Sequence, residues 1–367
     1  MIDLKSSRWG AAGRAFLGGG MVLVMVACPP EVTDPIQVAT CNLDPTLMFS
    51  SAAPNDVPAL VDPVMVPIGD PDAAYLLDED RVLGVVMNGE ARAYPHNIMW
   101  YHEIVNDIIG GQRIAVTFAP FTGSGVGYET NLGGSQLDLG VSGLLFANNL
   151  IMFDRAGGEI YGPQLSIEGR CQGFLGQSLD LVPVQEMSWG RWQALQPSTT
   201  VVSRALPFGA NYAIYPFGTY NDISDNQLVH RIAVDETRAI KERVLSIRSG
   251  DGGRGFPFLE LQSQGDLVAI NETVGGIPTA IFFEASDGQT ALAFDARVGV
   301  GGTTLTFDAD EVAGVFIDRE TSSTWTINGV ATSGAMDGEV MQTRADAFTM
   351  FWFAWKVFQP TGVVYAP

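Results

Sequence analysis

Residues 81–94 read RVLGVVMNGEARAY, in which Asn88-Gly89 separates two runs of mostly apolar residues. Both residues of an Asn-Gly pair adopt positive φ readily, so this dipeptide between alternating runs is the strongest short-range signal of a β-hairpin. From residue 95 to 109 the apolar spacing becomes that of a helical face, and Gly110-Gly111 follows it. The sequence therefore predicts a hairpin followed by a helix of about four turns.

The same stretch recurs later in the chain. Three pairs of segments match at nearly the same offset, which drifts by only a few residues: 81–83 with 243–245, 105–111 with 270–276, and 153–155 with 317–319. Separated matches in one register are not expected by chance, so we interpret them as an internal duplication. Two copies of one unit predict two similar lobes related by a pseudo-twofold, with a cleft between them as the default ligand site.

Most of the predicted elements are strands. Residues 189–195 are expected to form a short amphipathic helix and residues 347–358 an aromatic-rich helix. The fold class that this pattern indicates is a strand-dominated α+β protein. We divide the chain into a signal peptide of the lipoprotein type (1–27), a Pro-rich tether (28–72), a first repeat (73–204), a connector (205–241) and a second, divergent repeat (242–367).

The N-terminus resembles an export signal. Lys5, Arg8 and Arg14 precede an apolar run over 15–27, which is too short to span a bilayer and typical of a secretory signal. Its end directly before Cys28 resembles a bacterial lipoprotein cleavage site, with Cys28 as the lipidated residue. We expect a protein anchored by lipid on the periplasmic or outer surface of the cell envelope; the alternatives are plain secretion and an uncleaved anchor.

Charge and cysteine content restrict the partners. The formal net charge of -21 repels phosphate backbones, so we expect no nucleic-acid partner. In an oxidising envelope Cys41 and Cys171 either form a disulfide, which would join the tether to the first repeat, or remain separate thiols with Cys171 buried. There is no Cys-x-x-Cys and no zinc-type spacing, and we expect no cofactor.

Residues 89–95 (GEARAYP), 102–107 (HEIVND) and 116–125 (VTFAPFTGSG) resemble the DUF3179 domain of bacterial and archaeal proteins. The resemblance covers most of 81–204 and is weaker in the second copy. Members of that family commonly carry Cys-Pro-Leu-Cys-Gly, sometimes with selenocysteine, where this chain has APFTG at 119–123. A thiolate nucleophile, a dithiol couple or a soft-metal site needs sulfur or selenium, which Ala119 and Thr122 lack. The resemblance therefore implies a fold more than an activity.

Several polar residues remain as candidates near the 119–125 loop. They are His102, Glu103, Asp107, Thr122, Ser124 and Arg155. His102 could act as a general base oriented by Asp107 or Glu103, or as a metal ligand, and Arg155 could hold an anion. A hydrogen-bonded structural histidine is nevertheless favoured, because His102 faces inward and the second copy lacks a matching histidine. Asp154-Arg155 matches Asp318-Arg319 in the second copy. Its presence in both copies favours a role for Arg155 in a turn or an ion pair.

We therefore expect an exported, lipid-anchored binding or scaffolding module with an eroded family site. Its partners would be the membrane, through the lipid, and a small-molecule or protein ligand. The alternative is an enzyme independent of metal and thiol, using a residual His102 and Asp107 constellation beside the 119–125 loop.

Overall fold

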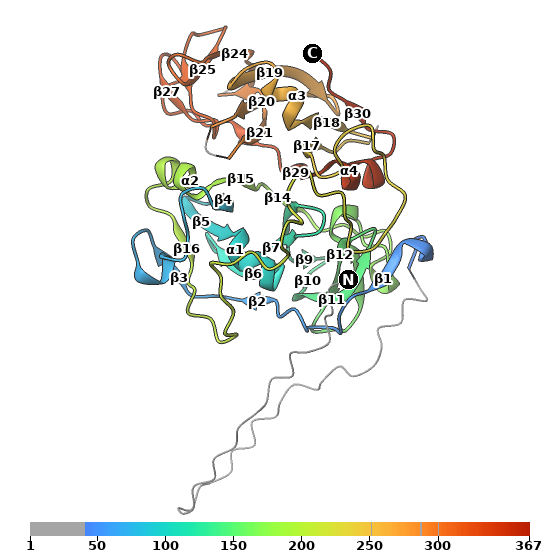
Figure 1. The fold of residues 1–367 in the computed structure, drawn as a ribbon. Helices are drawn as coiled ribbons and strands as arrows, with labels where there is room; N and C mark the ends of the chain where they lie inside the picture. The colour runs from blue at the N-terminus through green and yellow to red at the C-terminus, as the bar shows by residue number, and fades with distance from the viewer. Residues whose placement is uncertain (1–40, 251, 287, 300) are drawn as a thin grey trace, which may run out of the picture. The chain divides into compact units, whose positions relative to one another are not determined.

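The computed structural model of the chain describes residues 41–250, 252–286, 288–299 and 301–367. The expected signal peptide, the lipidation site Cys28 and residues 28–40 of the expected tether lie outside the described residues. All described residues fall within one compact unit of the chain (Figure 1).

The predicted hairpin is confirmed. Strands β4 (Arg81–Met87) and β5 (Glu90–Pro95) pair in antiparallel register, and Asn88 and Gly89 at the turn have φ angles of 51° and 82°. The hairpin forms the centre of a five-stranded sheet, which is completed by β15 (Gln185–Ser188), β16 (Thr200–Val202) and β3 (Met65–Pro67) in the order β15-β4-β5-β16-β3.

The predicted helix over 95–109 is wrong beyond His102. Helix α1 covers His96–His102, and β6 (Ile104–Ile109) follows it directly. Glu103, between them, has a φ of 55°, which no helical residue adopts. The β-branched residues after it pair with β7 (Gln112–Ala119) across the Gly110-Gly111 turn. Ladder bonds to a neighbouring strand thus prevail over the helical spacing of the apolar residues.

Two further sheets complete the first half. One has the order β14-β8-β7-β6-β2, with β14 (Leu181–Val182), β8 (Ser124–Glu129) and β2 (Leu60–Val61). The other has the order β1-β11-β12-β13, formed by Met48–Ser50, Leu139–Phe146, Asn149–Asp154 and Ile160–Pro163. A short ribbon joins β9 (Asn131–Leu132) to β10 (Ser135–Gln136), and helix α2 covers Trp189–Leu195.

Residues 41–72 belong to the folded unit, although the sequence suggested a tether. Strands β1, β2 and β3 of this segment pair with β11, β6 and β16, respectively. A disulfide joins Cys41 to Cys171. The prediction of a tether is therefore corrected for 41–72, because each of the three short strands completes the edge of a sheet.

The second half is built from three sheets of four strands and a ribbon. The first has the order β29-β17-β18-β30, formed by Ala347–Phe351, Arg243–Ile247, Arg254–Pro257 and Val363–Val364. The second has the order β19-β20-β21-β28, formed by Leu267–Val274, Ile277–Glu284, Thr290–Asp295 and Gln342–Thr343. The third has the order β24-β25-β26-β27, formed by Phe307–Asp310, Val315–Asp318, Thr324–Trp325 and Ala331–Ser333. The ribbon joins β22 (Arg297–Val298) to β23 (Thr303–Thr304).

The aromatic helix expected over 347–358 is only half helical. Residues 347–351 form β29, which pairs with β17, and helix α4 covers Trp352–Phe358. Helix α3 is Phe258–Gln262, and the short 3-10 helices η2 to η5 are Pro45–Leu47, Pro71–Ala73, Gln164–Ser166 and Gln172–Phe174. Among the described residues, no helix is long and apolar enough to cross a membrane.

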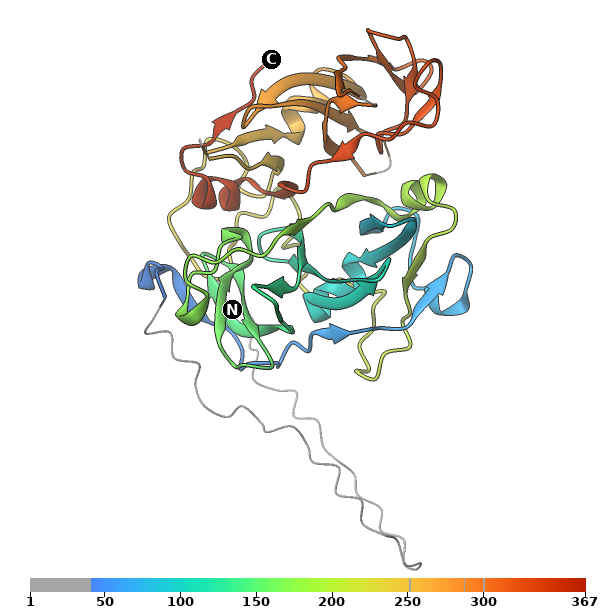
Figure 2. The same ribbon diagram turned by 180° about the vertical axis from the view of Figure 1, so that it is seen from behind.

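The connector over 205–241 contains neither helix nor strand, but it is packed against the fold. Tyr212, Tyr220 and Ile240 are buried. Seen from behind, its last residues lie beside α4 (Figure 2), where the Phe353 amide donates to the Ile240 carbonyl at 3.0 Å. The connector therefore contributes to the core between the two halves.

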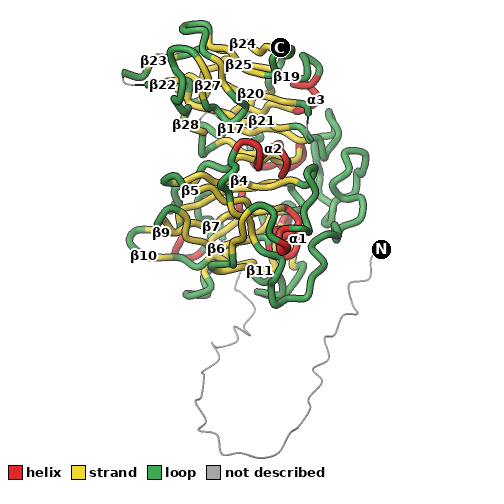
Figure 3. The backbone as a smooth tube through the Cα atoms, turned by 90° about the vertical axis from the view of Figure 1, so that its left-hand side faces the viewer, coloured by secondary structure: helices red, strands yellow, loops and turns green. Residues whose placement is uncertain are grey.

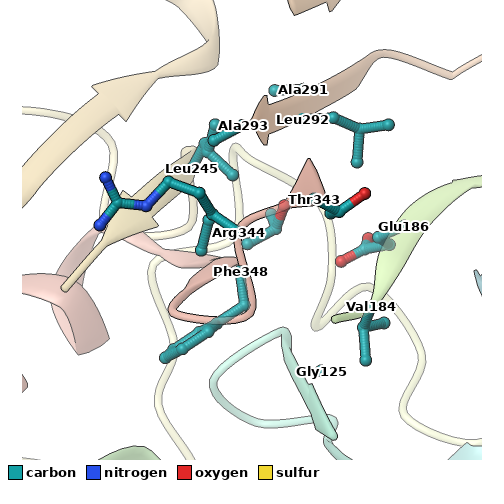
Figure 4. Close-up of a pocket in the computed structure, with 12 residues that line it drawn as sticks. Gly125, Val184, Glu186, Leu245, Ala291, Leu292, Ala293, Thr343, Arg344 and Phe348 are labelled. Carbon is teal, nitrogen blue, oxygen red and sulfur yellow. The ribbon is translucent and has the colours of Figure 1, made fainter. Parts of the chain in front are cut away.

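The two halves share their hydrophobic cores. One cluster contains Val126 and Met350, and another contains Trp192 and Phe282. Strand β8 packs beside β29 and β15 beside β21, and only about 10 Å³ of free space remains where these strands meet (Figure 4). Helix α2 lies at the edge of this junction (Figure 3). Its Arg191 pairs with Glu284 of β20 at 3.0 Å. The halves are therefore joined by core packing.

Candidate functional site

A cavity of about 550 Å³ opens beside this junction and is lined by residues of both halves and of the connector. Its apolar wall includes Trp100, Phe118, Phe258, Leu259 and Phe351, and its charged residues are Glu79, Asp80, Arg81, Glu186, Lys241, Glu242 and Arg243. Pro120 and Gly123, from the loop that joins β7 to β8, also line it. This loop occupies the position of the Cys-Pro-Leu-Cys-Gly motif in the resemblance described above.

An ion pair joins the partly buried Arg81, the first residue of β4, to the buried Glu186 of the neighbouring β15. The Nε atom of Arg81 donates to Oε1 of Glu186 at 2.7 Å, and Nη1 donates to the carbonyls of Gly288 and Gln289 at 2.7 and 3.0 Å. Burial opposes ionisation of Glu186 most strongly, but the positive charge of Arg81 holds the Glu186 pKa below its ordinary value. Glu186 is therefore a carboxylate at neutral pH.

Arg243, the first residue of β17, has no such counterion. Its Nη2 donates to the Gly288 carbonyl at 2.7 Å and to Oε1 of Gln289 at 3.0 Å, and its guanidinium lies 4.8 Å from the Phe258 ring centroid. Its Nη1 atom is buried without a hydrogen-bond partner among the described residues. Burial, with repulsion from Arg81, lowers the Arg243 pKa to about 9. Arg243 thus forms no ion pair with a described carboxylate, although the charge of Glu186 partly opposes the lowering of its pKa.

His96 begins α1 and faces the same cavity. Its ring is tilted against Phe118 at a centroid distance of 4.1 Å, and only 7% of the residue is exposed. Its Nε2 lies 3.8 Å from Oε1 of Glu186 and makes no hydrogen bond within the described part of the chain. Burial lowers the His96 pKa to about 4, so the imidazole is neutral at pH 7.

Lys241 is a third cation on the cavity wall. Its ammonium lies 3.5 Å from the centroid of the Tyr220 ring and 3.4 Å from a carboxylate oxygen of Asp225. The Asp225 oxygen is within ion-pair distance but is not oriented for a hydrogen bond with Nζ. Burial lowers the Lys241 pKa, against the opposing effect of Asp225. Lys241 is therefore held mainly by contacts within the connector.

His102, the leading candidate from the sequence, is fully engaged elsewhere. Its Nδ1 lies 2.8 Å from the Pro58 carbonyl and its Nε2 lies 2.8 Å from the Tyr212 hydroxyl. Burial lowers the His102 pKa, which the bond to Pro58 partly offsets. The residue is 1% exposed and does not line the cavity. These contacts are those of a histidine that fastens the N-terminal segment and the connector to α1.

The carboxylates near His102 in sequence do not orient it. Asp107 accepts two bonds of 2.6 Å from Arg92 and one of 2.8 Å from the Tyr94 hydroxyl. Glu103 is buried at the end of α1, and burial raises its pKa to about 8. The predicted constellation of His102 with Asp107 or Glu103 is therefore not assembled by hydrogen bonds.

Thr122 and Ser124 are brought together, but within the core. Their hydroxyl oxygens lie 2.8 Å apart, the Ser124 hydroxyl donates to Oε1 of Gln164 at 2.8 Å, and Asn149 donates to Thr122 at 2.9 Å. Both hydroxyl-bearing residues are completely buried, and neither lines the cavity. This network fixes the loop between β7 and β8, and it leaves no base beside either hydroxyl.

Arg155 forms a partly exposed ion pair with Asp138 at 3.2 Å. The preceding Asp154 accepts backbone amides of Asp138 and Gly157 at 3.0 and 2.8 Å, which closes a turn. Among the described residues, no group of three or more histidine, cysteine or acidic side chains is arranged to hold a metal ion.

The cavity residues were missed from the sequence, although two signals pointed to them. Arg81 and Arg243 are the first residues of the matching segments 81–83 and 243–245. His96 follows Pro95 as Phe258 follows Pro257, so a titratable ring in one copy corresponds to an apolar ring in the other. The arginine common to both copies, together with the replacement of His96 by Phe258 in the second copy, could have pointed to this site from the sequence.

The fold and the cavity define a strand-dominated α+β protein with a preformed pocket lined by buried charged groups. The chain belongs to the family described as "Protein of unknown function (DUF3179)", whose model matches residues 54–362 and thus spans both halves. No curated protein and no solved structure matches the chain.

Proposed function

We propose that this chain is a binding protein and that the cavity beside Arg81 and Arg243 is its ligand site. One observation carries this proposal: four buried polar atoms that lack hydrogen-bond partners among the described residues belong to side chains that line one cavity, namely Nε2 of His96, Oε2 of Glu186, Nζ of Lys241 and Nη1 of Arg243. Each such atom costs about 1–3 kcal/mol when it is left unsatisfied. A bound molecule with an acceptor group would supply partners for the three nitrogen atoms of this set.

We further propose that the cavity arose between two copies of one unit. The order β15-β4-β5-β16 corresponds to β29-β17-β18-β30, β14-β8-β7-β6 to β28-β21-β20-β19, and β11-β12-β13 to β24-β25-β26. The matched residues Asn106 and Asn271 support this correspondence at atomic detail. The side-chain amide of Asn106 donates to the Leu139 carbonyl at 2.8 Å and accepts the Leu139 amide at 3.0 Å, and Asn271 makes the same two bonds with Phe307 at 2.9 and 2.8 Å.

A pseudo-twofold between the copies would pass close to the cavity. Strand β8 corresponds to β21 and β15 to β29, so the contacts of β8 with β29 and of β15 with β21 exchange under such an axis. The cavity contains the matched pairs Arg81 with Arg243 and His96 with Phe258. In this proposal, the two copies first met in a symmetric junction and then diverged. The first copy now contributes the polar His96 to the cavity, and the second contributes the apolar Phe258 at the matching position.

We also propose that the protein acts outside the cytoplasm, anchored by lipid at Cys28. The basic residues and the apolar run before Cys28 support this location, and so does the disulfide between Cys41 and Cys171, since disulfides persist in oxidising compartments. The hydrogen bonds of His102 and Asp107 favour a binding role over the alternative enzyme, because both residues are held by structural partners.

The fluorescent probe 8-anilinonaphthalene-1-sulfonate tests whether the cavity of about 550 Å³ binds a small molecule. Leu259 lines the cavity but is 48% exposed, so Leu259→Trp narrows the space without disturbing a core position. Val312→Trp is the matched control, because Val312 is fully exposed and lies outside the cavity. We expect saturable binding to the parent chain and to the control, and at least tenfold weaker binding to Leu259→Trp. Equal binding to all three, or none to the parent chain, would contradict the proposal.

A further inference from the structure

We infer that the ligand is a small monocarboxylate with an apolar body, and this inference rests on the proposed binding function. It starts from the charges at the inner end of the cavity. Arg81 and Arg243 are both cations, while His96 is neutral at pH 7. Among the residues that the structure describes, Glu186 is the only carboxylate that forms an ion pair with either arginine. One positive charge is therefore left without a counterion.

Two cationic atoms on the wall have unused donor capacity, Nη1 of Arg243 and Nζ of Lys241, but Lys241 has a carboxylate, Asp225, within ion-pair distance at 3.4 Å. Nη1 of Arg243 is therefore the donor left for a ligand anion. The other terminal nitrogen of Arg243, Nη2, donates to the neutral acceptors Gly288 O and Gln289 Oε1. Nη1 is buried and has no partner among the described residues. A carboxylate is the acceptor that matches a guanidinium best, since the bond is charge-assisted and its planar geometry is defined. Nε2 of His96, in the tautomer that protonates this nitrogen, can donate to the same ligand.

The rest of the wall indicates what the carboxylate is attached to. Trp100, Phe118, Phe258 and Phe351 present aromatic faces or edges to the cavity. Burial of an apolar ligand against such rings is favourable, whereas a phosphate or sulfate would leave them solvated and would bring two charges to a site with one in excess. The chemistry therefore favours a molecule with one carboxylate and a compact hydrocarbon part.

The acidic residues on the wall do not reverse this selection, because two of the three outside the Arg81 pair are already engaged. Asp80 accepts the Leu77 amide at 2.8 Å and the Asn97 side-chain amide at 3.2 Å. Glu242 pairs with Arg238 at 3.1 Å. Glu79 is exposed, and its charge is therefore screened by solvent.

Three isosteric probes separate charge from shape: benzoate, benzamide and benzamidine. Calorimetric titration of the parent chain should show benzoate binding at least tenfold more tightly than benzamide, with benzamidine weakest. Arg243→Gln should weaken benzoate at least tenfold and leave benzamide within twofold. Arg319→Gln is the matched control, since Arg319 forms an exposed ion pair with Asp308 away from the cavity, and it should leave all three affinities unchanged.

The outcomes distinguish this inference from the proposed function. Equal binding of benzoate and benzamide, or preference for benzamidine, would overturn the carboxylate while the cavity remained a binding site for 8-anilinonaphthalene-1-sulfonate. Failure of every probe, including that fluorophore, would overturn both. If Arg243→Gln does not fold, Arg243→Lys retains the charge but not the planar donor pair, and an unchanged ratio of benzoate to benzamide affinity in that variant would contradict the role of the guanidinium.

Discussion

Arg81 and Arg243 donate to the same acceptor: Nη1 of Arg81 and Nη2 of Arg243 each lie 2.7 Å from the carbonyl oxygen of Gly288. Two guanidinium groups thus converge on one peptide group, although only Arg81 has a carboxylate partner, Glu186. Burial lowers the pKa of Arg243 most strongly, and the like charge of Arg81 lowers it further. The arrangement is understandable if a ligand supplies the second negative charge.

The two arginines are expected to differ in their effect on stability. Arg81→Gln leaves the buried Glu186 carboxylate without its counterion and should lower the free energy of unfolding by about 3–5 kcal/mol. Arg243→Gln removes a cation that has no counterion and should change it by less than about 1 kcal/mol, in either direction. Urea denaturation of both variants without ligand measures the difference. Equal losses would show that Arg243 is neutralised in a way that its contacts do not reveal.

His96→Phe should reduce the sensitivity of the fold to acid. The folded-state pKa of His96, about 4, lies below the unfolded value of 6.5, so between these values the unfolded chain binds more protons. The stability associated with neutral His96 is therefore present above pH 6.5 and is lost as the pH falls towards 4, by about 3 kcal/mol in total. Arg81, Arg243 and Glu186 face the ring, and Arg81 and Arg243 oppose its protonation.

Phenylalanine suits this position because Phe258 occupies the matching one. The measurement is the unfolding free energy of the parent chain and of His96→Phe at pH 7 and pH 4.5. The parent chain should lose more stability between the two pH values than the variant. Parallel losses would show that His96 does not contribute to the acid response.

Glu103→Gln should act in the opposite pH range. The folded-state pKa of Glu103, about 8, lies above its ordinary value of 4.5, so the folded chain binds the extra proton between these values. The stability from neutral Glu103 is fully present below pH 4.5 and is lost as the pH rises through 8. Glutamine keeps the neutral state at every pH, so the variant should be more resistant than the parent chain at pH 8.5. The measurement is the melting temperature of the parent chain and of Glu103→Gln at pH 6 and pH 8.5. An identical pH dependence of the two melting temperatures would show that the Glu103 carboxyl is solvated.

His102→Ala should destabilise the fold without changing binding at the cavity. The substitution removes two buried hydrogen bonds and leaves the Pro58 carbonyl and the Tyr212 hydroxyl without a ring partner. We expect a loss of about 2–4 kcal/mol in the free energy of unfolding. The affinity for 8-anilinonaphthalene-1-sulfonate below the melting range should remain within twofold. A stable variant with lost binding would instead place His102 in the ligand site.

Removal of the disulfide should be costly. Cys41 and Cys171 are separated by 130 residues, and closure of a loop of this length restricts the unfolded chain by about 5 kcal/mol in the chain-entropy model. Double replacement of both cysteines by alanine should therefore lower the unfolding free energy by several kcal/mol. Parallel unfolding of the parent chain with and without reductant provides the control, and no change in either comparison would contradict a bonded pair.

The local elements that were predicted correctly depend on short-range backbone chemistry. Asn88-Gly89 produced the expected turn because positive φ at both positions is a property of those residues. Helix α2 was expected over 189–195 and has these bounds, and its N-terminus is capped by the Ser188 hydroxyl, which accepts the Arg191 amide at 3.2 Å. Such signals require no knowledge of the rest of the chain.

The elements that were mistaken depend on distant partners. Residues 104–109 have helical apolar spacing, yet they form a strand because β7 offers a complete ladder beside them. Residues 347–351 behave in the same way because β17 pairs with them along their whole length. Periodicity alone does not contain the identity of a strand's neighbour, and this neighbour decides between the two structures.

The sequence by itself determined the strand-dominated α+β class, the hairpin turn and the resemblance to the DUF3179 family, since these follow from local residue patterns. Only the tertiary structure decided which polar residues face a common cavity. In the folded chain His102 and Ser124 are buried and hydrogen-bonded to structural partners. His96, Glu186 and Arg243 lie far apart in the sequence but line the same cavity. Burial and the distance to a counterion control the chemistry of these groups, and both are properties of the folded chain alone.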